Sequence, residues 1–117
     1  MLRVLVVDDH PHLRMLLCDV LTYWGCEADA VTDPVDGLER LERGAYDVLV
    51  TDGRMLRMNG VDLVERARER DAALRVVMLT SSGADIGPVA RRLGFTILRK
   101  PFDLGQLKTA VVDHALR

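Results

Sequence analysis

Five polar residues of this chain could together bind or transfer phosphate, and each follows a short apolar segment. They are Asp8, Asp9, Asp52, Thr80 and Lys100. Carboxylates can hold a divalent cation or act as nucleophiles, whereas a hydroxyl and an ammonium can stabilise the charge of a phosphoryl group. If folding brings these side chains together, their combination predicts chemistry on a phosphoryl group.

The three acidic residues of this set predict a cation site. Asp8, Asp9 and Asp52 cannot all stay ionised within a few ångströms of one another unless a positive charge lies among them. Hard oxygen ligands with room for water favour Mg²⁺. Lys100 would supply a second positive charge, and Thr80 a neutral hydrogen-bond donor.

The apolar segments that precede these residues predict the strands of a parallel sheet. They contain Val, Leu, Ile and Met without polar alternation and are too short for helices, which is typical of strands buried on both faces. These segments are residues 5–7, 48–50, 76–79 and 97–98. Ligands bind at the carboxyl ends of such strands, so we expect one edge of the sheet to carry all five polar residues.

Between the strands, apolar residues recur at helical spacing. We expect the residues that face the core to be Leu13, Leu16, Leu17, Val20 and Leu21 in the first helix, Val35, Leu38 and Leu41 in the second, Val61, Val64 and Ala67 in the third, Val89, Ala90 and Leu93 in the fourth, and Leu104, Leu107, Val111 and Ala115 in the fifth. The charged residues of the third helix are expected to form a solvated outer face: Glu65, Arg66, Arg68, Glu69 and Arg70.

Turn and capping residues set the limits of these helices. Gly25 is expected to end the first helix, and Asp33-Pro34 to begin the second. Asp103, with Gln106 three residues later, resembles a capping box. A weaker strand is expected at 27–31 and a strand at 95–98. Five alternating strand–helix units predict an α/β, flavodoxin-like (βα)5 doubly wound parallel sheet of strand order 2-1-3-4-5, as a single domain over residues 1–117.

Composition excludes several classes of partner. The chain has 117 residues with 16 basic and 18 acidic side chains, and a net charge of -2 does not favour direct nucleic-acid binding. No apolar stretch approaches the ~20 residues that span a membrane, and no secretory signal is expected. Cys18 and Cys26 are expected to be thiols in a reducing compartment, which favours a cytoplasmic location.

Four motifs, in this order and at this spacing, carry a resemblance to a known family. They are Val6-Val7-Asp8-Asp9, Val50-Thr51-Asp52 with Met55 and Asn59-Gly60, Leu79-Thr80-Ser81, and Lys100-Pro101-Phe102. Over essentially its whole length the chain resembles the receiver domain of response regulators in two-component signal transduction, of the chemotaxis-regulator type.

The resemblance implies a role for each motif residue. Asp52 matches the phosphoacceptor, which takes a phosphoryl group from a histidine kinase or a histidine phosphotransfer protein. Asp9 and Asp52 would bind Mg²⁺ directly and Asp8 through a water molecule, and the backbone carbonyl of Arg54 would complete the protein ligands.

The remaining motif residues would act on the phosphoryl group. Lys100 would pair with Asp52 and then with a phosphoryl oxygen, and Thr80 would turn toward that group. A cis peptide bond is expected between Lys100 and Pro101.

The resemblance also implies the partners. A downstream protein would read a face formed by the fourth helix, the fifth strand and the fifth helix. The protein is expected to be a monomer or a weak homodimer. It is not expected to be an enzyme, apart from slow loss of its own phosphoryl group. It would be either a stand-alone receiver or part of a longer regulator or hybrid kinase.

Some residues depart from the family pattern. Ile97 replaces an aromatic side chain that swings inward on activation, while Gly53 and Leu56 replace larger or stiffer residues, so a more mobile loop is expected. Arg54 and Ser82 occupy positions that, in the family, border the path of the water that removes the phosphoryl group. The fourth helix is expected to be short.

These departures keep a second function open, that of a pseudo-receiver which binds partners without phosphorylation. A third possibility is a phosphatase of the haloacid-dehalogenase type. It is disfavoured, because in that class the nucleophile ends the first strand and the acidic pair comes late.

His10 and His12 flank Pro11 beside the acidic pair and suggest a metal site. Two residues apart at the start of a helix, they do not share a face. The sequence therefore favours exposed loop histidines over metal ligands.

Overall fold

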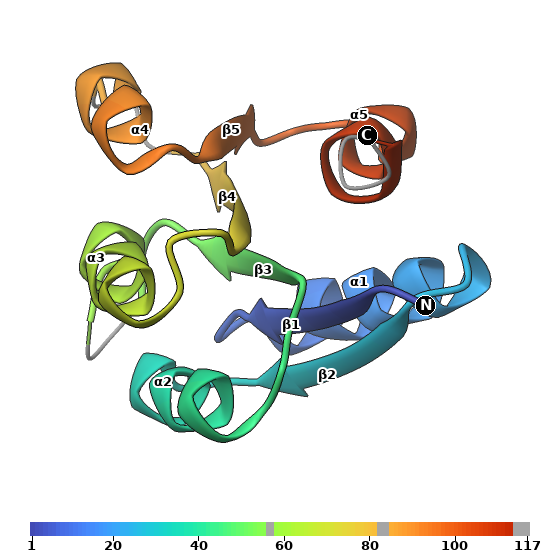
Figure 1. Cartoon of the computed structure of the whole chain (residues 1–117). Coiled ribbons are helices and arrows are strands. Elements are labelled where there is room, and N and C mark those ends of the chain that lie inside the picture. The colour runs from blue at the N-terminus through green and yellow to red at the C-terminus, as the bar shows by residue number, and fades with distance from the viewer. Residues whose placement is uncertain (56–57, 82–84, 114–117) are drawn as a thin grey trace.

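A parallel sheet of five strands forms the centre of the molecule (Figure 1). The computed structural model describes residues 1–55, 58–81 and 85–113. The strands are β1 (Arg3–Val7), β2 (Glu27–Val31), β3 (Val48–Asp52), β4 (Arg75–Thr80) and β5 (Thr96–Arg99). Their order is β2-β1-β3-β4-β5, which confirms the predicted order. Because every neighbouring pair is parallel, the carboxyl ends of all five strands meet at one edge.

Helices cover both faces of the sheet, as a doubly wound fold requires. They are α1 (Pro11–Tyr23), α2 (Pro34–Arg43), α3 (Gly60–Arg70), α4 (Gly87–Leu93) and α5 (Leu104–Lys108), which continues as a π-helix, η1 (Thr109–Asp113). α1 and α5 lie against one face, and α2, α3 and α4 against the other (Figure 1). In the described part of the chain, no helix is long and apolar enough to cross a membrane.

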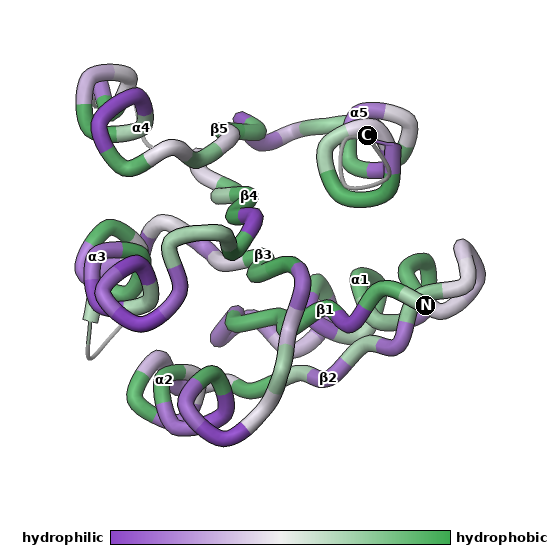
Figure 2. The backbone as a smooth tube through the Cα atoms, in the orientation of Figure 1, coloured by the Kyte–Doolittle hydropathy of each residue, from purple (hydrophilic) through white to green (hydrophobic). Residues whose placement is uncertain are grey.

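Two apolar clusters, one on each face, hold the layers together. In β1, Val4 and Val6 face the cluster under α1 and α5, while Leu5 and Val7 face the cluster under α2, α3 and α4. All four side chains are fully buried, each worth about 1.5–3 kcal/mol of transfer free energy. Figure 2 shows hydrophobic residues along the central strands and hydrophilic ones along α2 and α3.

The predicted helix limits are confirmed where capping residues set them. Asp33 accepts a hydrogen bond from the backbone N–H of Val35 (2.8 Å) at the start of α2. Asp103 and Gln106 form the reciprocal bonds of a capping box at the start of α5. Gly25 follows α1 with φ of +88°, a conformation that favours glycine.

Three side chains predicted to face the core are exposed instead: Leu16 (48%), Val35 (38%) and Leu104 (43%). In α2 the cause is Gly37, where a Cβ atom would lie only 2.9 Å from a methyl group of Val7. The helix therefore approaches the sheet through Pro34 and Gly37, and Val35 turns outward. The predicted position Ala115 lies outside the described residues.

The last strand and the fourth helix differ slightly from expectation. β5 begins at Thr96 rather than Phe95, whose ring is buried just before the strand. α4 has seven residues and starts with Pro88 in its first turn. A short fourth helix was expected from the spacing between Thr80 and Lys100.

Arg68 is not part of the solvated face predicted for α3. Its guanidinium donates to the carbonyl oxygens of Leu93 (2.8 Å, from Nε) and Gly94 (2.9 Å, from Nη2), at the end of α4. It also donates to the carbonyl oxygens of Ala72 and Leu74, in the connection to β4. Burial lowers the pKa of Arg68. One side chain thus satisfies carbonyl groups of two separate segments.

Replacing Arg68 with alanine should lower the free energy of unfolding by about 1–3 kcal/mol, because several carbonyl groups lose a charged donor. Urea denaturation measures the change. Arg66 is the matched control, since it is exposed on the same helix and its replacement should change stability by less than about 0.5 kcal/mol. Equal effects of the two substitutions would contradict a structural role for Arg68.

Candidate functional site

The carboxyl edge of the sheet brings together the polar residues singled out in the sequence. Asp8 directly follows β1, Asp52 ends β3, Thr80 ends β4 and Lys100 directly follows β5. Register places Asp52 beside Leu79 of β4, one residue before Thr80. Four strands therefore deliver their terminal side chains to one place.

Asp8, Asp9 and Asp52, here called the acidic cluster, occupy the centre of this edge. Asp8 and Asp52 are 1% and 4% exposed. Asp8 Oδ1 accepts a hydrogen bond from the backbone N–H of His10 (2.8 Å). Within the described residues, Asp8 Oδ2 and Asp9 Oδ1 are buried yet accept no hydrogen bond. Burying carboxylate oxygens without hydrogen-bond donors costs free energy, and a cation bound among the three acids would offset that cost.

Lys100 provides a positive charge on one side of the acidic cluster. Its Nζ lies 3.4 Å from Asp52 Oδ1. Its backbone N–H donates to the carbonyl oxygen of Thr80 (2.8 Å), which joins the end of β5 to the end of β4. The peptide bond between Lys100 and Pro101 is cis, as the resemblance implied.

Thr80 lies next to Gly53 and is 3% exposed. A Cβ atom at position 53 would be 3.1 Å from the hydroxyl of Thr80 and 3.2 Å from its Cβ, so glycine leaves room for this side chain. Gly53 donates to the carbonyl oxygen of Leu79 (2.9 Å) and accepts from the N–H of Gly60 (3.1 Å). The residue after Asp52 is thus fixed by backbone hydrogen bonds. Leu56 lies outside the described residues.

Gly60 lies against the backbone of the acidic residue of β3. A Cβ atom there would be 2.5 Å from the carbonyl oxygen of Asp52 and 3.0 Å from the Cα atom of Gly53. Asn59 accepts from the N–H of Asp62 (2.9 Å) and so begins α3 at this point. The Asn59-Gly60 motif therefore allows α3 to start directly beside the acidic cluster.

Arg54 is exposed, and only its backbone reaches the cluster. Its N–H lies 3.5 Å from Asp52 Oδ1, at the outer limit of a hydrogen bond. That its carbonyl oxygen binds a cation stays a prediction. Ser82, the other residue expected along the path of water, lies outside the described residues.

His10 lies at the site, although the sequence favoured an exposed loop histidine over a metal ligand. Its side chain is 65% exposed, as expected of a loop histidine, but Nδ1 lies 3.1 Å from Asp8 Oδ1, 3.1 Å from Asp9 Oδ1 and 3.5 Å from Asp52 Oδ2. The absence of a helix face shared with His12 does not bear on this contact, because His10 follows the acidic pair directly and approaches it from the start of α1.

The donor set fits a divalent cation. Three carboxylates and His10 each offer one ligand atom, all within 4.8 Å of one another. The carboxylate oxygens without hydrogen bonds are the ligand type that Mg²⁺ prefers. Asp8, Asp9 and Asp52 therefore suit the predicted ion.

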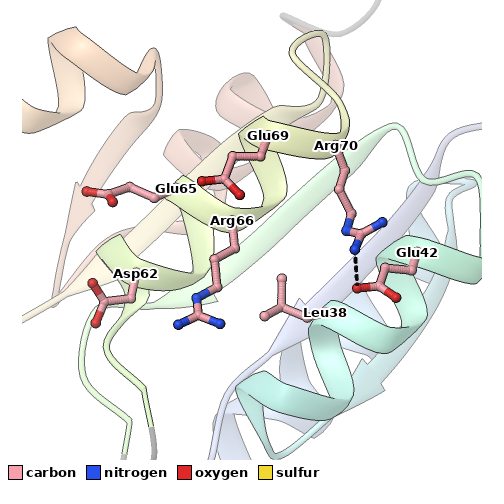
Figure 3. Close-up of a pocket in the computed structure, with 7 residues that line it drawn as sticks. All are labelled: Leu38, Glu42, Asp62, Glu65, Arg66, Glu69 and Arg70. Atoms are coloured by element: carbon pink, nitrogen blue, oxygen red, sulfur yellow. Dashed lines mark ion pairs between the residues drawn. The ribbon is translucent and has the colours of Figure 1, made fainter.

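A hollow between α2 and α3 is separate from this site (Figure 3). Its lining is mostly charged and includes no residue of the acidic cluster. Arg70 Nη2 and Glu42 Oε1 form an ion pair of 3.0 Å across it. Exposed pairs of this kind add little stability, and the surface has the character of a solvated face.

Residues 4–112 match the protein-family model described as response regulator receiver domain. Part of the sensor protein EvgS of Escherichia coli is 36% identical over 110 residues, which is 92% of this chain and 9% of EvgS. Part of the sensor histidine kinase RcsC of Salmonella typhi is 35% identical over 118 residues, 99% of this chain and 12% of RcsC. The chain therefore spans only about a tenth of the length of these sensor proteins.

A relative of similar length and two solved structures are also similar to this chain. Sporulation initiation phosphotransferase F of Bacillus subtilis is 27% identical over 114 residues, 96% of this chain and 92% of that protein. TrrA of Thermotoga maritima, solved in complex with Mg²⁺ and BeF, has a TM-score of 0.88 at 26% identity, covering 97% of this chain and 98% of TrrA. A receiver domain from Francisella has the same fold, with a TM-score of 0.90 at 23% identity, covering 100% and 98%.

Proposed function

The chain belongs to the response regulator receiver domain family, and from this we propose that residues 1–117 act as one receiver domain that is phosphorylated on Asp52. The donor is the phosphohistidine of a histidine kinase or of a histidine phosphotransfer protein. The relatives that are sensor proteins support such donors. Phosphorylation switches a face that a downstream partner reads.

The observation that carries this proposal is the position of the buried Asp52 carboxylate, which lies between the ammonium group of Lys100 and the other two acids of the cluster. Asp52 alone among the three acids lies within 3.4 Å of Lys100 Nζ. Asp8 is instead fixed by the backbone of His10. Asp52 also ends the strand next to the one that delivers Thr80. It is therefore the acid best placed as nucleophile.

In the transfer step, an oxygen of Asp52 attacks the phosphorus atom of the donor. The new bond is an acyl phosphate, and the phosphorus–nitrogen bond of phosphohistidine breaks, with its electron pair staying on the imidazole nitrogen. Lys100 then pairs with a phosphoryl oxygen, and the Thr80 hydroxyl donates to another. These fixed donors stabilise charge that develops during transfer.

Mg²⁺ would be held by Asp8, Asp9, Asp52 and the carbonyl oxygen of Arg54, and it supplies positive charge against the phosphoryl oxygens. Without such a charge, the three acids of the cluster would repel an incoming anion. Asp8 and Asp9 therefore serve to recruit the cation, and Asp52 serves to react.

The switch would run from Thr80 to the face formed by α4, β5 and α5. Phosphorylation replaces the single negative charge of the Asp52 carboxylate with an acyl phosphate of about 1.5 to 2 negative charges, and it brings new acceptor oxygens next to the Thr80 hydroxyl. The backbone bond from Lys100 to the Thr80 carbonyl connects that position directly to the end of β5. A shift of Thr80 is thereby transmitted to an edge strand, where a partner protein can bind.

The functional form we propose is a monomer or weak homodimer in the cytoplasm. Cys18 and Cys26 are both free thiols, which suits a reducing compartment. Burial raises the pKa of both thiols and so keeps them unreactive. Beyond slow hydrolysis of its own acyl phosphate, we propose no enzymatic activity.

A pseudo-receiver that works without phosphate is the second candidate. Ile97 favours it, because a half-buried aliphatic side chain stands where the family has a rotating aromatic residue. The buried acidic cluster and Lys100 disfavour it. A pseudo-receiver has no need to bind Mg²⁺.

Incubation with acetyl phosphate tests both candidates. With Mg²⁺ the protein should gain the mass of one phosphoryl group, and with a chelator in place of Mg²⁺ the gain should be lost, because the uncompensated acids repel the donor. Intact-mass spectrometry gives the readout, and calorimetric titration with Mg²⁺ measures the affinity. A protein that binds no Mg²⁺ and takes up no phosphoryl group is a pseudo-receiver.

Arg54 should prolong the life of the acyl phosphate. Its long cationic side chain starts two residues after Asp52 and can reach the phosphoryl oxygens, where it hinders the attacking water. Arg54→Ala should speed the decay of the phosphorylated protein by up to about tenfold. Loss of phosphoryl group over time, measured by mass spectrometry, gives the rates. Arg66→Ala is the control, and equal decay in wild type and Arg54→Ala would remove this role.

A further inference from the structure

We propose that His10 is a ligand of the divalent cation, so that the metal site of this protein combines the carboxylates of Asp8, Asp9 and Asp52 with one imidazole nitrogen. The inference rests on the proposed function for the place of the cation among the acids. It goes beyond that function because it assigns an imidazole nitrogen as a ligand. A nitrogen ligand changes the relative affinity of the site for different metals.

The first support is the spacing of the ligand atoms. Ligands at neighbouring corners of an octahedron with bonds near 2.1 Å lie about 3.0 Å apart. His10 Nδ1 lies 3.1 Å from one oxygen of Asp8, 3.1 Å from one of Asp9 and 3.5 Å from one of Asp52. The nitrogen therefore stands at the separation from each acid that a shared ion requires.

The second support is the unsatisfied acid next to the ring. Asp8 is 1% exposed, and its Oδ2 accepts no hydrogen bond within the part of the chain that the structure describes. Asp9 Oδ1 is buried and close to Nδ1, but their geometry is not that of a hydrogen bond. The ring makes one hydrogen-bond contact with the cluster, between Nδ1 and Asp8 Oδ1 (3.1 Å). Among the described residues this leaves Asp8 Oδ2 and Asp9 Oδ1 without a donor, and an ion bound among these atoms would satisfy them.

The third support is how the ring is held in place. His10 occupies the N-cap position of α1 but makes no capping hydrogen bond, so its side chain is available to the cluster. Its backbone N–H is fixed by Asp8 Oδ1 (2.8 Å). Arg14 donates to the carbonyl oxygen of Asp8 (3.0 Å), and its own N–H binds the carbonyl oxygen of His10 (3.0 Å). The start of the helix thereby directs the imidazole toward the acids.

An imidazole ligand changes the metal preference in a definite direction. All-oxygen sites suit Mg²⁺, whereas imidazole nitrogen suits Ni²⁺ and Zn²⁺. When Nδ1 gives its lone pair to the metal, the ring proton resides on Nε2, in a side chain that is 65% exposed. The site should therefore bind Ni²⁺ more tightly, relative to Mg²⁺, than the three acids alone would.

Pulsed electron paramagnetic resonance with Mn²⁺ as the probe reads the ligand directly. The wild-type protein should show hyperfine coupling from a ¹⁴N nucleus bound to Mn²⁺, and this coupling should disappear when only histidine is labelled with ¹⁵N. His10→Ala should lose the coupling, because the ligand is gone while the helix loses no cap. His12→Ala is the matched control, since His12 is exposed two residues away and should leave the coupling unchanged.

Metal titration supplies an independent reading. His10→Ala should weaken Ni²⁺ binding on the order of tenfold or more while changing Mg²⁺ binding much less. A wild-type protein that binds Mn²⁺ without nitrogen coupling would overturn the proposal, as would coupling that survives in His10→Ala. In that case His10 is a hydrogen-bonding neighbour of the acids only.

Failure of this inference is distinguishable from failure of the proposed function. A protein that takes up a phosphoryl group from acetyl phosphate but shows no nitrogen coupling is a receiver whose cation has oxygen ligands alone. A protein that shows the coupling but takes up no phosphoryl group keeps the metal site and loses the receiver function. Absence of any Mn²⁺ binding would overturn both.

Discussion

Asp52→Asn is expected to abolish phosphoryl uptake from acetyl phosphate in the presence of Mg²⁺. The amide has the shape of the carboxylate but lacks a nucleophilic oxygen with negative charge, so no acyl phosphate forms. The fold should be retained, because removing one of three clustered negative charges relieves repulsion. Intact-mass spectrometry should show the unmodified mass alone.

Asp19→Asn is the matched control for this result. Asp19 is exposed on α1, away from the carboxyl edge of the sheet, and its replacement should leave phosphoryl uptake unchanged. Uptake that persists in Asp52→Asn at the wild-type level would place the acceptor elsewhere. Loss of uptake in both variants would indicate a general effect of charge rather than a reaction at one carboxylate.

Gly60→Ala is expected to lower the free energy of unfolding by about 1–3 kcal/mol, the usual cost of overpacking. The added methyl group would lie 2.5 Å from the Asp52 carbonyl oxygen and 3.0 Å from the Gly53 Cα atom, and neither backbone atom can move alone. Helix propensity opposes this effect, since alanine is favoured over glycine in helices by about 1 kcal/mol. Denaturation by urea measures the balance.

The same substitution should weaken Mg²⁺ binding, because relieving the clash displaces the backbone of Asp52. Gly105→Ala is the control for Mg²⁺ binding, since its contact at 3.2 Å is with the capping carboxylate of Asp103 and not with the backbone of Asp52. That variant should leave the Mg²⁺ affinity unchanged. A Gly60→Ala protein of full stability and unchanged Mg²⁺ affinity would contradict the close approach of α3 to the site.

The sheet and its reactive edge were predictable because their signals are local. Short apolar segments around Val6, Val50 and Val77 indicate buried strands, and polar residues at their ends fix which edge carries the chemistry. Right-handed crossovers then leave few possible strand orders. The convergence of Asp8, Asp52 and Lys100 follows from that order alone.

The orientation of individual helices was not predictable from periodicity. An apolar stripe defines a face, but it does not say which edge of that face meets the sheet. Val35 is exposed because Gly37 lets α2 approach through its own backbone, and that contact with Val7 depends on the tertiary structure. Leu16 lies at the margin of its stripe, and Leu104 is the first residue of α5.

The contacts of two polar residues, Arg68 and His10, could not be predicted from the sequence. A charged residue on an amphipathic helix is assigned to solvent, yet Arg68 binds carbonyl groups whose positions only the fold reveals. His10 and His12 do not share a helix face, but His10 contacts the three acids of the cluster at the edge of the sheet. The partners of Arg68 belong to other segments of the chain. Of the three partners of His10, only Asp52 is distant in sequence.

The chemical identity of the phosphorylated residue can be read by trapping the acyl phosphate. Reduction of the phosphorylated protein with borohydride converts the modified aspartate to a stable alcohol, which peptide sequencing by mass spectrometry then locates. The expected result is modification at Asp52 alone, in samples that contain Mg²⁺. Modification of another aspartate, or a phosphoryl group found on a histidine, would contradict a mechanism in which the edge of the sheet presents Asp52 as the acceptor.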